Sequence, residues 1–264
     1  GARIMFDKGF SVGISGPDLS GLVQGVSGKV EFVPAKTVKE AEEWAKNNSG
    51  IKHIDYSGLD VRVANGMNER LLYYSQNYPE AVKSMQFYGR AQAEVELRYK
   101  LQVENVIQKL KEKGKSKKYI DKWIEENMVK PDLSTAHAYY NSGTGIAVNF
   151  DKQDFDKFLK MRMANVANGY HPIGCESFES MIDHEFGHLL DTTYSIRSGN
   201  TEFVKLLSEI DMDDIKNTLA EYATINQDEL IAEAWTSYVN NPGHGEIADK
   251  IGNMIVDASK RKVV

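Results

Sequence analysis

Residues 181–191 have the sequence MIDHEFGHLLD, which contains the pattern His184-Glu185-x-x-His188. In a helix, positions i and i+4 lie on one face about one turn apart, so both imidazoles can point at a single ion. Glu185 projects beside them, where it can contact water at the ion without being a ligand. Apolar residues cover the other faces of this helix: Phe178, Met181, Ile182, Phe186, Leu189 and Leu190. The stretch therefore predicts a buried helix that carries a metal site.

Two histidines inside an apolar helix have an alternative interpretation as satisfied structural residues. Their burial one turn apart is costly unless something satisfies both, which favours a metal. A catalytic zinc site needs a third protein ligand and leaves a fourth position for water. Cys175 lies before the helix and is interpreted as a small residue near a turn, and His244 lies in a loop sequence, Pro-Gly-His-Gly. A carboxylate is therefore the favoured third ligand.

The predicted carboxylate lies on a second helix, within the sequence DELIAEAW at residues 228–235. Glu229 and Glu233 are one turn apart there, and a divalent cation with its histidines would relieve the strain between two buried carboxylates. We interpret Glu229 as the third ligand and Glu233 as the acceptor for a ring N–H of His184. The alternative for Glu229 is helix capping with Asn226. Two aspartates are the next candidate ligands: Asp191 and Asp228.

These two motifs resemble the catalytic domain of anthrax lethal factor and its relatives, which are gluzincin metallopeptidases with a His, His, Glu zinc site. The resemblance rests on HEFGH at residues 184–188 and on the later pattern Tyr222-x6-Glu229-x-x-Ala-Glu-Ala. It covers roughly residues 139–238. The fold that it implies is a zincin-like metallopeptidase domain with a small β-sheet and an active-site helix.

The resemblance implies a zinc-dependent endopeptidase that acts on a peptide or protein substrate, with Zn²⁺ held by His184, His188 and Glu229. Glu185 would take the proton from the attacking water and pass it to the leaving amine. The hydroxyl of Tyr222 would donate to the oxyanion. Two other functions remain open at this point, a non-catalytic interaction module that keeps a zincin fold and a zinc hydrolase of a non-peptide amide.

Residues 1–30 are rich in glycine and serine, and we interpret them as a flexible N-terminal arm or linker, followed by one zincin-like domain over residues 31–264. Residues 36–92 and the sequence GYHP at 169–172 resemble zincin domains attached to phage head-morphogenesis proteins. That resemblance implies one domain of a larger, phage-associated or toxin-like protein. The first twenty residues lack the pattern of a signal peptide, so no export signal is expected.

The spacing of apolar residues predicts a helix-rich α+β fold. Alternating strands at residues 136–140 and 146–150, joined by NSGTG, predict a hairpin, and the second strand is interpreted as the sheet edge that binds an extended peptide. Four helices are expected before the hairpin: 37–50, about 59–78, 95–110 and 119–128.

The composition excludes several classes of site and partner. One cysteine among 264 residues excludes a disulfide framework and every multi-cysteine zinc site. A net charge of −6 argues against a general nucleic-acid binder, and no apolar run approaches the ~18 residues that span a membrane. The lysines between residues 109 and 118 are interpreted as a solvated helix end, with an anionic partner as the alternative. Single histidines, His137 and His171, are interpreted as structural or surface residues, with substrate contact as the alternative.

Overall fold

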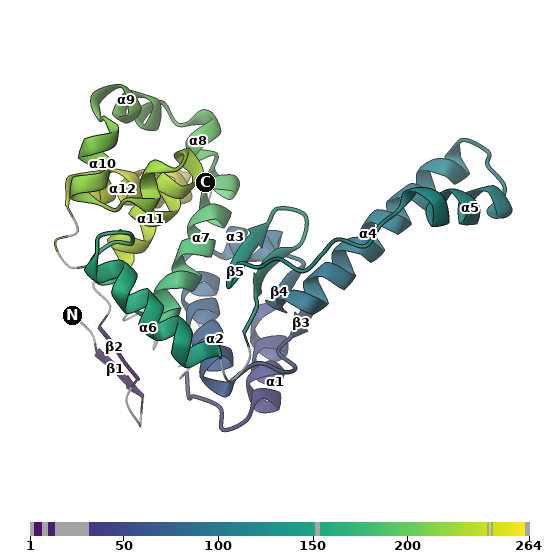
Figure 1. The fold of residues 1–264 in the computed structure, drawn as a ribbon, viewed down its shortest axis with the longest axis horizontal. Coiled ribbons are helices and arrows are strands. Elements are labelled where there is room, and N and C mark those ends of the chain that lie inside the picture. The colour runs from purple at the N-terminus through teal and green to yellow at the C-terminus, as the bar shows by residue number, and fades with distance from the viewer. Residues whose placement is uncertain are drawn as a thin grey trace.

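The structure, a computed structural model, describes residues 3–6, 10–13, 32–150, 154–241, 243 and 245–261. As the apolar spacing predicts, they form a helix-rich α+β fold with a small mixed sheet (Figure 1). Within the predicted arm, residues 1–30, the structure describes the backbone of two antiparallel strands, β1 (Arg3–Phe6) and β2 (Phe10–Gly13). The rest of that arm lies outside the described residues.

The four-stranded sheet has the order β3 (His53–Asp55), β4 (Phe87–Arg90), β6 (Gly145–Val148) and β5 (Ala138–Asn141). The first two pairs are parallel, and β5 and β6 form the predicted antiparallel hairpin. The prediction that residues 146–150 form the sheet edge is wrong. β6 pairs with β4 on one side and with β5 on the other, and all of its residues are buried, whereas the half-buried β5 ends the sheet.

The two helices predicted near the start of the domain are confirmed. In α1 (Val38–Ser49) the side chain of Thr37 accepts a hydrogen bond from the first turn, and Gly50 ends the helix with φ 69°, a left-handed conformation that suits glycine. Asp60 caps α2 (Val61–Asn77), and α3 (Pro79–Ser84) follows it directly. Most residues of α2 are buried, so this helix lies inside the domain.

The two helices predicted next, α4 (Ala91–Glu112) and α5 (Lys117–Asn127), form a hairpin that projects away from the rest of the fold (Figure 1). In α4 the buried residues belong to its first two turns, and α5 buries only Ile120. All lysines between residues 109 and 118 are exposed at the far end of this hairpin, as the interpretation of a solvated helix end requires.

The C-terminal half is helical and is built around α7 (Phe178–Tyr194), which includes the HEFGH motif and is buried along most of its length. Among the described residues, no helix combines the length and apolar character needed to cross a membrane. The other elements of this half follow in chain order: α6 (Asp154–Ala167), α8 (Ile196–Gly199), α9 (Thr201–Glu209), α10 (Met212–Thr218), η2 (Tyr222–Thr224), α11 (Gln227–Asn240) and α12 (Glu246–Arg261).

Helices α7 and α11 approach each other closely at Gly187, the glycine of the HEFGH motif. A Cβ atom at this position would lie 2.9 Å from the Cα of Ala232 in α11. A larger residue would therefore push the two helices apart. The side chains at positions 184, 188, 229 and 233 lie within one turn of this crossing, so the crossing brings the two predicted motifs together.

A buried polar network next to the crossing joins α7 to α2 and α11. Asp183 is fully buried and accepts hydrogen bonds from Arg70 Nε (3.1 Å), Tyr74 Oη (2.8 Å) and Asn240 Nδ2 (2.9 Å). These donors come from α2 and α11, so one carboxylate connects three helices. Its charge is compensated by the guanidinium, as the burial of a carboxylate requires.

Candidate metal centre

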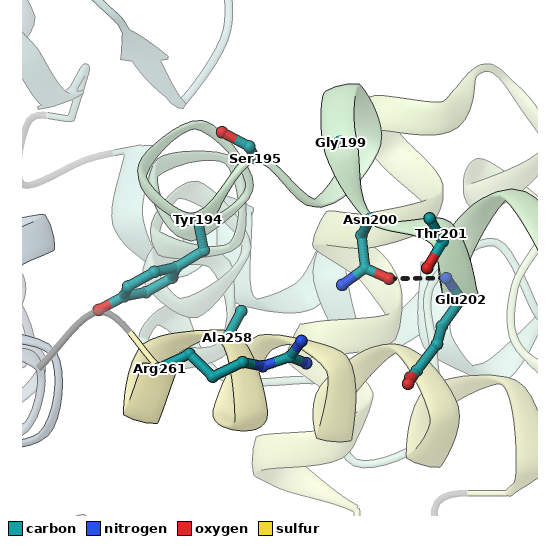
Figure 2. A pocket seen from close by; sticks show the side chains of 8 residues that line it. All are labelled: Tyr194, Ser195, Gly199, Asn200, Thr201, Glu202, Ala258 and Arg261. Atoms are coloured by element: carbon teal, nitrogen blue, oxygen red, sulfur yellow. Dashed lines mark hydrogen bonds between the residues drawn. The ribbon is translucent and has the colours of Figure 1, made fainter. Parts of the chain in front are cut away.

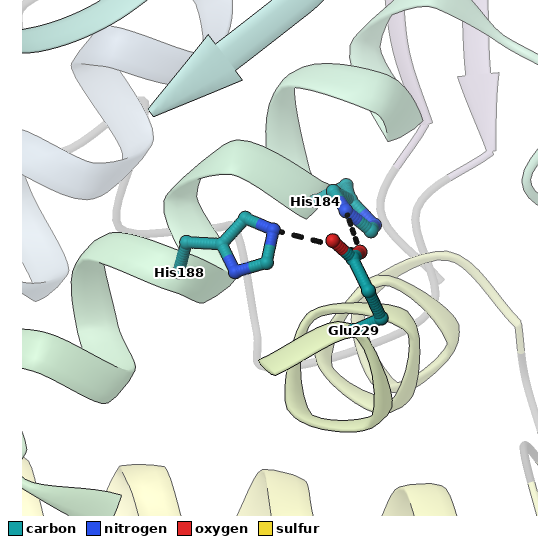
Figure 3. A group of neighbouring side chains, drawn as sticks. All are labelled: His184, His188 and Glu229. Carbon is teal, nitrogen blue, oxygen red and sulfur yellow. Dashed lines mark ion pairs between the residues drawn. The ribbon is translucent and has the colours of Figure 1, made fainter. Parts of the chain in front are cut away.

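Three predicted ligands converge at the crossing of α7 and α11 (Figure 3). The Oε2 atom of Glu229 lies 2.9 Å from Nε2 of His184 and 3.6 Å from Nε2 of His188. One ligand atom from each residue lies within 4.8 Å of the others. The structure thus places the two histidines of HEFGH around the carboxylate that the sequence assigns as the third ligand.

The chemistry of this cluster fits a divalent metal. Glu229 Oε2 is buried and has no hydrogen-bond donor in suitable geometry, although two imidazole nitrogens lie beside it. Ligands that bind zinc tetrahedrally at ~2.0–2.1 Å are roughly 3.3 Å apart, and the two observed separations, 2.9 Å and 3.6 Å, lie on either side of that value. Two imidazoles and one carboxylate form a donor set typical of catalytic zinc.

The alternative capping role of Glu229 is also present, but it uses the backbone. Asn226 is the N-cap of α11, and its side chain accepts a hydrogen bond of 2.8 Å from the Glu229 N–H. The Glu229 side chain remains directed at the histidines. Capping and metal ligation therefore do not compete, and the cap fixes the helix turn from which the carboxylate projects.

Glu233 occupies the position that the sequence predicts for it. It is fully buried one turn further along α11, and its Oε1 lies 2.7 Å from Nδ1 of His184. Its second oxygen, Oε2, lies 3.1 Å from Nδ1 of His171. The contact with His171 is not foreseen by the sequence, because His171 is 62 residues away and belongs to the segment before α7.

The imidazoles and carboxylates of the cluster shift one another's pKa values. Burial alone would lower the pKa of His184, but its contacts with Glu229 and Glu233 reverse the effect and raise that pKa to about 10. Burial likewise opposes ionisation of the two carboxylates, yet the neighbouring imidazoles lower the pKa of Glu229 and that of Glu233 to about 2 each. Both carboxylates are therefore anionic at neutral pH, as metal binding requires.

The predicted base and the predicted tyrosine lie in one cleft with the cluster. This cleft has a volume of about 450 Å³, and Glu185, Tyr222, His184, His188 and Glu229 contribute to its wall. Burial raises the pKa of the Glu185 carboxyl. Burial and the charges of nearby carboxylates raise the pKa of Tyr222 to about 12, so its hydroxyl remains a hydrogen-bond donor at neutral pH.

Two other tyrosines of the C-terminal half have hydrogen-bond partners outside the cleft. Tyr194 donates to Glu80, and Tyr238 donates to Asn253. Neither lines the cleft, whereas the ring centroid of Tyr222 lies 5.9 Å from that of His184. The geometry thus agrees with the tyrosine that the family resemblance implies.

The cleft also has residues that the sequence did not single out. Tyr140 of β5 lines it, as does Arg197 from α8. Arg197 pairs through Nη1 with Asp228 Oδ1 at 2.6 Å, and its backbone N–H donates to Asp191 Oδ1 at 2.8 Å. The two alternative third ligands are therefore held by one arginine and do not join the cluster.

His137 and a second cavity lie apart from this centre. The ring of His137 stacks on Phe150 with centroids 5.1 Å apart, which agrees with a structural role.

The second cavity lies between the end of α7, the start of α9 and the end of α12 (Figure 2). It is lined by residues such as Tyr194, Asn200 and Arg261, and none of the predicted site residues belongs to it.

Comparison of the chain with models of known families, with curated proteins and with solved structures finds no match.

Proposed function

We propose that this chain is a zinc-dependent endopeptidase with a zincin-like fold. The observation that carries the proposal is the convergence of His184, His188 and Glu229 in an open cleft that also contains Glu185. A purely structural role for the buried helix α7 explains neither why the Glu229 carboxylate is directed at two imidazoles nor why the Glu185 carboxyl lies beside them. The same residues carry the motif resemblance to the catalytic domains of lethal factor and its relatives, which favours the same reaction.

Each residue has a defined task in this reaction. His184, His188 and Glu229 would hold zinc, which would supply a Lewis acid able to lower the pKa of a water molecule towards ~7 and to polarise a carbonyl group. Glu185 accepts the proton from the attacking water and delivers it to the leaving amine. Burial raises the pKa of the Glu185 carboxyl, so this carboxyl takes up a proton more readily than one in water. Tyr222, which keeps its proton, donates a hydrogen bond to the carbonyl oxygen as negative charge develops there.

The edge strand β5 is the substrate platform in this proposal. It ends the sheet in the part of the chain that the structure describes, and three of its residues, Ala138, Tyr139 and Tyr140, line the cleft. An extended peptide can add to such an edge through main-chain hydrogen bonds. This platform replaces the sequence-based assignment of the edge to residues 146–150, and a peptide added to it would lie next to α7.

The substitution Glu185→Gln tests the proposal. It keeps the shape and volume of the side chain but removes the group that moves the proton. We expect bound zinc to stay at one per chain while cleavage of a diverse peptide library falls by at least about 100-fold. Turnover retained by Glu185→Gln would contradict the assignment of the base. Zinc bound by the wild-type chain without any cleavage would favour the non-catalytic module or a non-peptide amide substrate.

A further inference from the structure

The segment before α7 is fastened to the segment that includes Tyr222. Two backbone hydrogen bonds join them, from Glu221 N–H to the Gly169 carbonyl and from Tyr222 N–H to the Tyr170 carbonyl, each 3.0 Å long. The ring of Tyr170 also lies edge-on to that of Tyr222, with centroids 5.4 Å apart. Tyr222 belongs to a single short 3-10 turn, so these contacts supply positional restraint that the turn itself lacks.

His171 extends this connection to the ligand side of the cleft. Its ring centroid lies 5.3 Å from that of Tyr222, and its Nδ1 lies 3.1 Å from Glu233 Oε2. Glu233 in turn contacts Nδ1 of His184 through its other oxygen, at 2.7 Å. One imidazole therefore touches both the tyrosine and the carboxylate that orients a metal ligand.

Hydrogen-bond chemistry fixes the direction of these contacts. The Glu233 carboxylate is fully buried and can only accept, so Nδ1 of His171 and Nδ1 of His184 each donate to it. This arrangement leaves Nε2 of His184 as the ring nitrogen that faces the cluster, 2.9 Å from Glu229 Oε2. Without the second donor, Glu233 Oε2 would be buried and unpaired, and rotation of the carboxylate would no longer be restrained on that side.

We propose that His171 is a positioning residue that holds the side chains of Glu233 and Tyr222 in a fixed relative position. The proposal rests on the proposed function, because that reaction needs the ligand His184, which Glu233 orients, and the hydroxyl of Tyr222 at fixed places around the substrate. The side chain of His171 is 12 % exposed and does not line the cleft, so it acts through its two neighbours and not on the substrate. A positioning role is a form of the structural role that the sequence interpretation favours for His171, and it takes the place of the alternative, a substrate contact.

Two substitutions separate the two contacts. His171→Phe keeps a ring against Tyr222 but removes the N–H that Glu233 accepts. We expect its zinc affinity to fall roughly 10–100-fold, the usual effect of losing a group that orients a metal ligand. His171→Asn keeps an N–H donor near the position of Nδ1 but removes the ring. We expect it to bind zinc within about threefold of wild type and to lose roughly 10-fold or more in kcat with little change in KM.

The contact with Tyr222 is tested by a double-mutant cycle. If His171 acts by placing the tyrosine hydroxyl, His171→Asn should have no further effect on kcat in a Tyr222→Phe background. An equal loss of kcat in both backgrounds would overturn this part of the proposal. Wild-type zinc affinity in His171→Phe would overturn the other part. Far-UV circular dichroism of each variant detects a general loss of folding. The matched control is His53→Asn, the same type of substitution at a histidine on β3.

The proposed function can fail separately from this inference. Zinc affinity, measured by competition with a chromogenic chelator, needs no turnover. If the wild-type chain binds zinc but cleaves no peptide, the peptidase assignment fails while His171→Phe still tests whether His171 orients the ligand set. Weakened zinc binding in His171→Phe together with near-normal binding in His171→Asn supports the donor role in either case.

Discussion

Neighbouring residues at the start of α11 have different partners, although both are acidic. Glu229 projects into the cluster with His184 and His188, whereas Asp228 pairs with Arg197 at 2.6 Å. A helix turns by about 100° per residue, so adjacent side chains point to different surroundings. The role of each carboxylate is therefore set by its position on the helix and not by its charge alone.

This difference predicts the outcome of two charge-removing substitutions. Glu229→Gln keeps the side-chain volume but removes the anionic ligand, and its zinc affinity should fall by more than the roughly 10–100-fold typical of changes to groups outside the ligand set. Asp228→Asn, the matched control one residue away, should bind zinc almost as wild type does. Zinc content after dialysis, measured by atomic emission, distinguishes them. Equal losses in both variants would indicate that Glu229 is not a ligand.

At the scale of elements, the site is produced by the close crossing of two helices. Gly187 in α7 faces Ala232 in α11, and each helix has two of the four side chains that form the cluster and its support. The polar network around Asp183 connects the same two helices to α2. Local stability and ligand geometry therefore depend on the same contacts.

Gly187→Ala should disturb both properties. Its Cβ would lie 2.9 Å from the Cα of Ala232, so the helices must separate slightly. We expect the free energy of unfolding to decrease by about 1–3 kcal/mol and zinc affinity to decrease with it. Gly199→Ala is the control, since its nearest neighbour, Ser195 Cβ, would be 3.7 Å away. Urea unfolding and zinc titration of both variants measure the effects. Normal zinc binding by Gly187→Ala would show that the spacing of the helices is not critical.

The buried carboxyl group of Glu69 in α2 predicts a dependence of stability on pH. Burial raises the pKa of Glu69 to about 8, despite the opposing charge of Arg70. The folded state holds this proton more tightly than the unfolded state does. Protonation of Glu69 therefore makes its full contribution to the free energy of unfolding below about pH 4.5, and this contribution is lost as pH rises through 8. Glu69→Gln should therefore flatten the decrease in Tm between pH 5 and pH 8.5, measured in the presence of a chelator. A pH profile parallel to that of wild type would contradict this origin.

The elements themselves were largely predictable because their signals are local. The N-cap Thr37, the left-handed Gly50 and the His-Glu-x-x-His spacing each act within one or two helical turns. The missed features are long-range. His171 and Glu233 are 62 residues apart, and Arg70 and Asp183 are 113 apart, so no sequence window contains both partners. The edge position of β5 likewise depends on which strands pair, which hairpin spacing alone does not determine.

The whole molecule combines a packed helical body with a projecting hairpin of α4 and α5 (Figure 1). Beyond Val95, α4 has no buried residue, whereas the residues of the candidate metal centre belong to α7, η2, α11 and the segment before α7. The two ends of the hairpin are close, since Lys130 Nζ lies 3.5 Å from Glu96 Oε1. The hairpin is therefore separable from the site in both packing and position.

This separation predicts that the hairpin can be removed. Replacing residues 100–127 with a short Gly-Ser linker should leave zinc stoichiometry unchanged and zinc affinity within about threefold, because few core contacts are lost. Zinc titration together with circular dichroism gives the readout. A shortened chain that folds but no longer binds zinc would mean that the hairpin supports the centre through contacts with the body.

The most direct measurement restores zinc to the chelated chain in steps and follows cleavage of the peptide library at each step. We predict that cleavage is absent from the metal-free protein, rises in proportion to bound zinc and reaches its maximum at one zinc per chain. The Glu185→Gln variant should bind the same zinc and remain inactive. Cleavage by the metal-free chain, or a fully zinc-loaded wild-type chain that cleaves nothing, would contradict the assignment of this centre as a zinc peptidase.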